Sequence, residues 1–228
     1  MKVLLVAPHA DDETLGAGGT LNRHVREGDD VTVVVMTGPG PEPHPIMPHS
    51  VWDVVRSEAR AACDVLGVQN LIFRELPAVL LPDEPVWTVN REAARVLEEV
   101  QPDILYVPFP FDLHHDHRSV FYAFSVAWRP HTEVGQGIRE IYAYETLSET
   151  HWNPAYLEAG FLPNCFVDIS ETLATKMKAM ECYASQLQEA PHFRSLRALE
   201  ALAVLRGGQV SVFAAEAFVS IRQIRLRK

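Results

Sequence analysis

Apolar residues in the first two-thirds of the chain come in short, nearly continuous runs that alternate with longer stretches of mixed polarity. The runs at 3–7 and 31–37 are apolar or β-branched almost throughout, which is typical of strands buried on both faces of a sheet. The mixed stretches end at Gly28, at Gly67 or just before Pro102, where helices commonly stop. The pattern predicts strands at 3–7, 31–37, 71–73, 104–107 and 140–144, and helices at 14–27, 56–66, 88–100 and 117–128.

This alternation of strand and helix favours an α/β protein with a Rossmann-like, doubly wound and mostly parallel sheet. The stretch 39–48 holds five prolines and is expected to be a loop, as is 129–137. After residue 150 the pattern changes to one strand at 166–169 and two helices at 171–184 and 195–205, a helical C-terminal extension. Since no linker or repeat separates the parts, we expect one domain over 1–228, with an α/β core at 1–150 and an extension at 151–228.

Composition and charge narrow the function. The 228 residues carry a formal charge of −10, which disfavours a nucleic-acid partner because phosphate contacts need a basic face. No apolar run approaches the ~20 residues that cross a bilayer, and the N-terminus does not resemble a signal peptide, so no membrane partner is expected. Three scattered cysteines without a CxxC pair argue against a disulfide framework and favour a cytoplasmic location.

Two clusters of titratable residues carry the candidate chemistry. Residues 8–13 read PHADDE and follow the first predicted strand, whereas residues 112–117 read DLHHDH and follow the fourth. Both clusters fall at carboxyl ends of strands, where ligands bind in open parallel sheets, and strands one and four are neighbours in the doubly wound order. Acids at a helix start gain ~0.3–1 kcal/mol each from the helix dipole, but capping accounts neither for His9 nor for three histidines in four residues.

A divalent metal explains both clusters together. Two histidines and one carboxylate form a known ligand set for hydrolytic zinc, with a position left for water, and the same set also suits Fe²⁺ or Co²⁺. Zinc lowers the pKa of bound water and polarises a carbonyl group. A second carboxylate beside the metal would then accept the proton of that water.

The motifs HADDETLGAGGT (9–20) and DLHHDH (112–117) resemble the two signatures of the PIG-L/LmbE family of zinc-dependent N-deacetylases, (P/A)HPDDExxxxGG and DxHxDH. Ala10 replaces the proline of the first signature. Weaker matches near residues 58–67, 176–186 and 215–218 extend the resemblance over nearly the whole chain. The resemblance implies a hydrolase that removes an N-acetyl group from an amino sugar or an N-acetylglucosaminyl conjugate, so the expected partner is a small N-acetylated sugar.

The resemblance also implies roles for individual residues. His9, Asp12 and His117 would bind the metal, and Asp11 would be the general base. His114 would stabilise the oxyanion and Asp116 would orient His114.

Substrate contacts are less well defined by the resemblance. Members of the family usually carry an arginine three residues before the helix glutamate, whereas this chain has Val55 there and Arg56 next to it. Arg56 is therefore one expected substrate contact. Tyr144, at the end of the fifth predicted strand, is a second one, as a donor to the oxyanion. Some relatives form trimers or hexamers, so by analogy a homo-oligomer is an option that the sequence leaves open.

Other functions fit less well. A dinucleotide-binding domain would place phosphates where Asp11, Asp12 and Glu13 would repel them, and GAGG is not GxGxxG. No GxSxG motif supports a serine hydrolase. Two alternatives stay open: an amidase of a thiol–sugar conjugate, and a metal-binding relative without catalysis.

Overall fold

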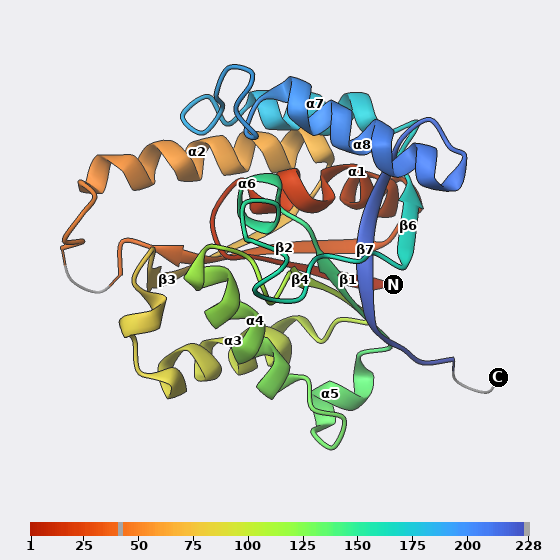
Figure 1. Ribbon diagram of the computed structural model, residues 1–228. Coiled ribbons are helices and arrows are strands. Elements are labelled where there is room, and N and C mark those ends of the chain that lie inside the picture. Colours follow the sequence, from red (N-terminus) through yellow and green to blue (C-terminus); the bar gives the residue numbers. More distant parts are fainter. Residues whose placement is uncertain (41–42, 226–228) are drawn as a thin grey trace.

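A seven-stranded sheet with the strand order β3-β2-β1-β4-β5-β7-β6 forms the centre of the computed structural model, which describes residues 1–40 and 43–225 (Figure 1). The first five strands run parallel, and β7 is antiparallel to both β5 and β6. The strands are β1 (Lys2–Ala7), β2 (Asp30–Gly38), β3 (Asn70–Pro77), β4 (Ile104–Pro108), β5 (Glu140–Tyr144), β6 (Cys165–Asp168) and β7 (Ala215–Gln223). The helices are α1 (Asp12–Arg26), α2 (His49–Leu66), α3 (Val86–Val100), α4 (His115–Ala127), α5 (Glu133–Gly137), α6 (Leu147–Thr150), α7 (Leu173–Glu181) and α8 (Leu196–Val210), with a short 3₁₀ turn at Leu81–Asp83.

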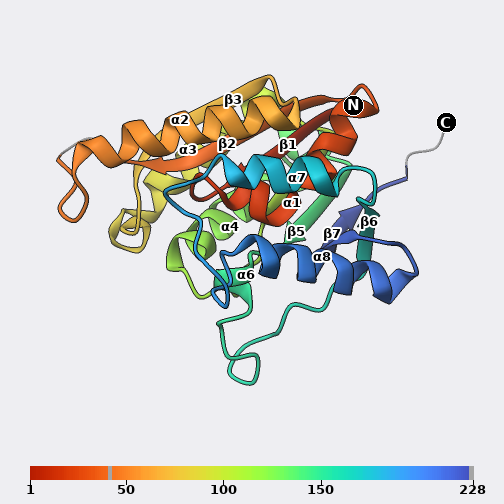
Figure 2. The ribbon, with the colours of Figure 1, turned by 90° about the horizontal axis from the view of Figure 1, so that it is seen from above.

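Helices cover both faces of the sheet. One face carries α1, α2, α7 and α8, and the other carries α3, α4 and α5 (Figure 1). Seen from above, α7 crosses α1 between α2 and α8 (Figure 2). Successive residues of β1 enter the two separate cores, with Val3 and Leu5 on the α1 side and Leu4 and Val6 on the α3 side. The double burial explains why this strand is apolar at every position and confirms the predicted α/β class.

The strand order places the two clusters at one edge of the sheet. β1 pairs with β2 on one side and with β4 on the other, so the chain order reverses between β1 and β4. The loops that follow β1 and β4 leave the sheet at this switch point, where doubly wound sheets bind ligands. The predicted adjacency of the first and fourth strands is therefore confirmed.

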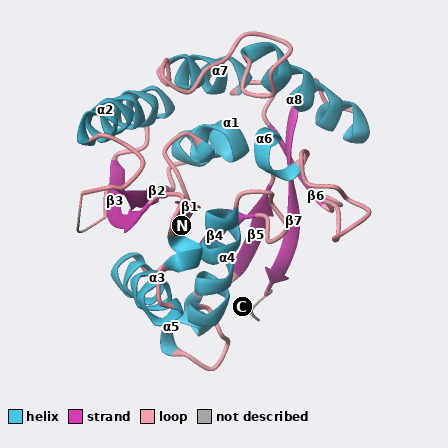
Figure 3. Cartoon of the chain, turned by 60° about the vertical axis from the view of Figure 1, so that its left-hand side comes forward, coloured by secondary structure: helices cyan, strands magenta, loops and turns pink. Residues whose placement is uncertain are grey.

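The C-terminal third contains a strand that the sequence pattern does not predict. β7 lies between β5 and β6 and completes the sheet (Figure 3). The organisation as one domain stays a prediction, and its support is that β6 and β7 join the same sheet as the first five strands.

Several predicted boundaries are wrong. α2 begins at His49 rather than at 56, and α5 lies inside the predicted loop 129–137. α8 runs through Gly207 and Gly208 to Val210 instead of ending before them. Residues 41–42 of the predicted proline-rich loop lie outside the described residues. Within the described residues, no helix is both long and apolar enough to cross a membrane.

The small residues at the start of α1 permit a kink and close packing. Ala17 leaves the helical conformation at φ −147° and ψ 19°, and Glu216 of β7 accepts the freed N–H groups of Gly19 and Thr20 at 3.0 and 2.7 Å. A Cβ atom on Gly16 would stand 2.3 Å from the Tyr144 ring. Glycine at this position therefore lets α1, which begins with the first cluster, lie directly on the sheet.

Candidate active site

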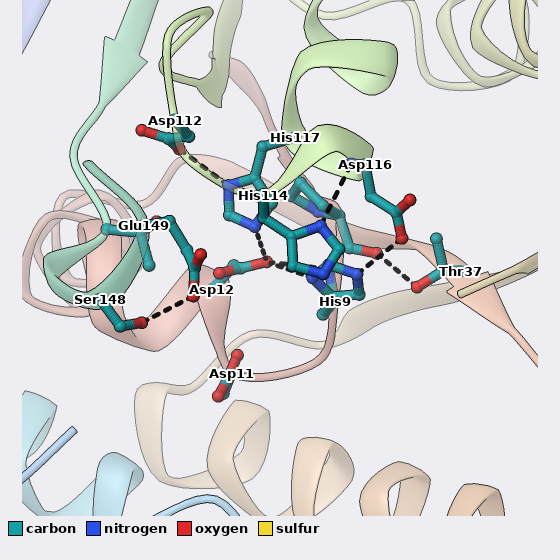
Figure 4. A network of polar contacts seen from close by, with 12 residues as sticks. His9, Asp11, Asp12, Thr37, Asp112, His114, Asp116, His117, Ser148 and Glu149 are labelled. Carbon is teal, nitrogen blue, oxygen red and sulfur yellow. Dashed lines mark hydrogen bonds and ion pairs between the residues drawn. The ribbon is translucent and has the colours of Figure 1, made fainter. Parts of the chain in front are cut away.

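The turns after β1 and β4 bring three predicted metal ligands together. His9 and Asp12 flank the start of α1, and His117 lies in the first turn of α4. Each offers one ligand atom, and the three atoms lie within 4.8 Å of one another (Figure 4). Asp12 Oδ2 is at the centre of the group, 3.2 Å from His117 Nε2 and 3.5 Å from His9 Nδ1.

His117 is oriented toward this centre by a buried carboxylate. Its Nδ1 donates to Asp112 Oδ2 at 2.8 Å, and Thr150 Oγ1 donates to the other oxygen of Asp112 at 2.6 Å. His117 Nε2 is buried and makes no geometrically acceptable hydrogen bond with any described residue, although Asp12 is near. An orphaned ring nitrogen beside a second imidazole and a carboxylate fits a divalent cation.

Charge interactions among the ligands shift the pKa values of His117 and Asp12 in opposite directions. Burial opposes the charged form of His117, but Asp12 and Asp112 outweigh it and hold its pKa well above the usual value. Burial likewise opposes ionisation of Asp12, and His117 and His9 hold its pKa well below the usual range. A metal ion would take the place of protons at the imidazoles, because histidine binds metal in its neutral form.

Asp116 has a different partner from the expected one. Its side chain does not orient His114. Asp116 Oδ2 accepts from His9 Nε2 at 2.9 Å and from the Val79 N–H at 2.6 Å, and Oδ1 accepts from the Leu81 N–H at 3.1 Å. Asp116 therefore orients His9. Since His9, His114 and Asp116 also offer atoms within 4.8 Å of one another, His9 belongs to two overlapping candidate ligand sets.

His114 is the N-cap of α4. Its Nδ1 accepts the Asp116 backbone N–H at 3.1 Å. Burial and the neighbouring His9 lower the pKa of His114 to about 4, so the ring is neutral near pH 7. Because Nδ1 is an acceptor, the single ring proton lies on Nε2 and can be donated to a substrate.

Asp11 lies beside the ligands in a strained backbone conformation. Its φ is 121°, and its N–H donates to Glu13 Oε2 at 3.1 Å. The other oxygen of Glu13 accepts from the Tyr183 hydroxyl at 2.6 Å. Asp11 Oδ2 is buried without a hydrogen-bond partner in the described part of the chain. Burial and the Asp12 charge raise the pKa of Asp11 to about 8, and a guanidinium, that of Arg194, partly offsets the shift.

Arg194 is a site residue that the sequence analysis missed. It comes from the loop before α8, and its Nη1 lies 3.5 Å from Asp11 Oδ2. The same Nη1 donates to Gln186, Nη2 donates to Glu149 and Nε donates to Ser148, each at 3.2 Å. A single arginine in an irregular segment carries no motif, so only the tertiary structure reveals it.

The two predicted substrate contacts lie in different surroundings. Arg56 lines a cavity together with His9 and Asp11, and its guanidinium forms an ion pair with Glu75. Tyr144 is fully buried, and its hydroxyl donates to the Val6 carbonyl at 2.8 Å. The Tyr144 hydroxyl therefore already bonds to the backbone of β1, so we do not assign it to the oxyanion.

Fold and site together define an α/β protein with a candidate metal-dependent hydrolytic centre at its switch point. Residues 4–128 match the PIG-L family model, described as GlcNAc-PI de-N-acetylase, and the chain belongs to this family. The diacetylchitobiose deacetylase of Thermococcus kodakarensis is 27% identical over 82% of this chain and 71% of the relative.

Solved structures share the fold. The N,N′-diacetylchitobiose deacetylase of Pyrococcus horikoshii superimposes with a TM-score of 0.74 and 22% identity, over 96% of this chain and 83% of that one. A 4-carboxy-2-hydroxymuconate hydratase of Pseudomonas putida superimposes with a TM-score of 0.77 and 21% identity, over 100% and 99%. At these identities the likeness establishes the fold alone.

Proposed function

We propose that the protein is a metal-dependent hydrolase that removes an N-acetyl group from an amino sugar or an N-acetylglucosaminyl conjugate. The observation that carries this proposal is the convergence of His9 and Asp12 on the buried Nε2 of His117, with Asp11 Oδ2 beside them. Within the described residues, neither His117 Nε2 nor Asp11 Oδ2 has a hydrogen-bond partner. Family membership and the names of deacetylases among the relatives support it.

We propose zinc as the metal, held by His9, Asp12 and His117, with Fe²⁺ or Co²⁺ as competitors for the same ligands. When bound, such a cation polarises the amide carbonyl and acidifies a water molecule. Asp112 would keep the His117 ring in the tautomer that leaves Nε2 free.

The remaining steps belong to side chains around the ligands. A cation bound beside Asp11 would lower the pKa of its carboxyl group and keep it ionised. Asp11 Oδ2 would then accept the proton of the attacking water, since no described residue places a competing donor closer than Arg194. His114 Nε2–H donates to the developing oxyanion. The C–N bond breaks, the amine leaves with the proton taken from water, and acetate is the second product.

Acetate release from metal-loaded protein, measured over a panel of N-acetylated amino sugars and their conjugates, tests the proposal. Asp11→Ala should retain the metal and lose most turnover. His115→Ala, which changes an exposed histidine of the same motif, should keep both and is the matched control.

Release that persists in Asp11→Ala would remove Asp11 from the mechanism. With metal bound, no release from any sugar would favour one of the two alternatives. Cleavage of a thiol–sugar conjugate would identify the amidase, and no turnover of either class would indicate a non-catalytic metal-binding relative.

We also propose that the protein acts on a small molecule in the cytoplasm. Its three cysteines are free of disulfides in the described structure, and its net charge disfavours a nucleic-acid partner. A homo-oligomer stays a prediction, which light scattering after size-exclusion chromatography tests.

A further inference from the structure

A cavity of about 180 Å³ opens directly beside the catalytic cluster. At one end it reaches His9, Asp11 and His114, to which the proposed chemistry assigns metal binding, proton transfer and oxyanion stabilisation, respectively. The opposite wall comes from α2, the segment before it, and β3. A substrate bound at the cluster can therefore extend into the cavity.

The far wall is apolar. It is formed by Met47, Val51, Trp52, Val55 and Phe73. A pyranose ring placed against this wall would lose hydrogen bonds from several hydroxyl groups, which is costly because, among the described residues, the wall offers just the indole N–H of Trp52 in exchange.

Among the described residues, most polar side chains around the cavity already have partners, and the exceptions are Asp11 Oδ2 and the indole N–H of Trp52. Arg56 is paired with Glu75, and the Thr37 hydroxyl donates to the Pro8 carbonyl at 2.8 Å. At the catalytic end, Gln186 accepts from Arg194 at 3.2 Å. The cavity therefore suits hydrocarbon better than a polyhydroxylated ring.

The volume of the cavity indicates how long a hydrocarbon chain it can hold. A cavity of about 150 Å³ with apolar walls holds a benzene molecule, so this one has room for roughly six carbons. In an amino sugar, the carbons next to the nitrogen carry or adjoin hydroxyl groups, whereas the acyl side is pure hydrocarbon. The single methyl group of an acetyl leaves most of the cavity unfilled.

We propose that this cavity holds the acyl chain of the substrate, and that the protein prefers N-acyl groups of about four to six carbons to acetyl. The inference rests on the proposed function and changes only the acyl group. Water still adds to the acyl carbon and the C–N bond breaks. The proton passes to the amine, and a short-chain fatty acid is released instead of acetate.

The test compares kcat/KM for N-acetyl-, N-butanoyl-, N-hexanoyl- and N-decanoylglucosamine. We expect an increase of roughly fourfold for each added methylene up to about six carbons, and none beyond that length. A profile that is flat from acetyl to hexanoyl, or that falls, overturns the inference and leaves N-acetyl hydrolysis standing.

A pair of variants on α2 locates the effect. Val51 lines the cavity but is not part of the hydrophobic cores, whereas Val54 is exposed on the same helix. Val51→Phe should fill the cavity and abolish the preference for hexanoyl over acetyl. Val54→Phe should retain the native profile. Equal profiles in the two variants would place the acyl chain elsewhere.

A binding measurement separates this inference from the proposed function. Calorimetry on metal-loaded Asp11→Ala gives dissociation constants for N-hexanoyl- and N-acetylglucosamine without turnover. Hexanoyl should bind at least tenfold more tightly, even if no substrate is hydrolysed by the native protein. Equal affinities, or no binding of either sugar, would overturn the inference.

Discussion

Tyr183 is tied to the proposed general base through one buried carboxylate. Its hydroxyl donates to Glu13 Oε1 at 2.6 Å, and Glu13 Oε2 accepts the Asp11 N–H at 3.1 Å. Asp11 has a φ of 121°, which a non-glycine residue adopts only when its surroundings enforce it. Changing Tyr183 to phenylalanine should therefore loosen the support of the strained residue while leaving the ligands in place.

The magnitude follows from the contacts of Glu13. A hydrogen bond to a charged acceptor contributes about 1.5–3 kcal/mol, and removing it from Oε1 leaves the bond from Thr14 Oγ1 at 2.6 Å. No acceptor is orphaned, so we expect a loss of about 2 kcal/mol in the free energy of unfolding. For a chain of this size that lowers the melting temperature by about 4–8 °C. A displaced Asp11 should reduce kcat about tenfold or more with little change in KM.

Unfolding in urea and by heat, together with steady-state kinetics, measures both effects. Tyr142→Phe is the control. The Tyr142 hydroxyl also donates to a glutamate at 2.6 Å, but this glutamate, Glu140, is the first residue of β5, at the opposite end of the strand from the candidate site. The control should lose less than about 1 kcal/mol and keep kcat. If Tyr183→Phe is no less stable than Tyr142→Phe and has native kcat, Glu13 does not position Asp11 through this contact.

Three further predictions concern the ligands and a buried ion pair. His117→Ala should lose bound metal, as measured by elemental analysis; unchanged metal content would exclude His117 as a ligand. Asp112→Asn should weaken metal affinity by about tenfold or more in a chelator competition, because the carboxylate that orients His117 loses its charge. Arg206→Met should cost about 3–5 kcal/mol at pH 7, because it leaves the buried Glu145 carboxylate with His151 as its one remaining side-chain partner among the described residues. Burial opposes ionisation of Glu145, but the hydrogen bonds from His151 and Arg206 outweigh it and lower its pKa. The ion pair therefore stabilises the protein above the unfolded pKa of about 4.3 and loses this effect as the pH falls through the folded value. Urea unfolding at pH 7 and pH 4 should show a smaller cost at the lower pH, and an equal cost would contradict the assignment.

The central strands could be predicted from the sequence because both of their faces are buried. β1 and β2 are apolar because each successive side chain enters one core or the other, and the motifs follow directly after β1 and β4. β7 could not be predicted in the same way, because its second residue, Glu216, is a buried charge. Only the folded chain shows its partner, Lys176, which forms an ion pair with it from α7.

The residues of the candidate site could be predicted from the sequence, but their hydrogen-bond partners could not. The spacing of DLHHDH places Asp116 between two histidines of its own helix, yet its carboxylate bonds to His9 of the other loop. The amides of Val79 and Leu81 hold the carboxylate in that direction, and they come from a segment with no recognisable motif. Arg194 illustrates the same limit, because its position beside Asp11 depends on how the segment before α8 crosses the sheet edge.

The likeness to a hydratase as well as to deacetylases shows that this fold accommodates more than one reaction. The reaction must therefore be decided by the side chains that face the substrate beside the metal ligands. Asp11 has a carboxylate oxygen that no described residue bonds, and His114 has a ring proton to donate; these are the acceptor and the donor that amide hydrolysis requires. Asp11 and His114 also line the cavity proposed to hold the acyl chain. The residues that would cleave the amide bond would therefore lie next to the walls that would select the acyl group of the same substrate.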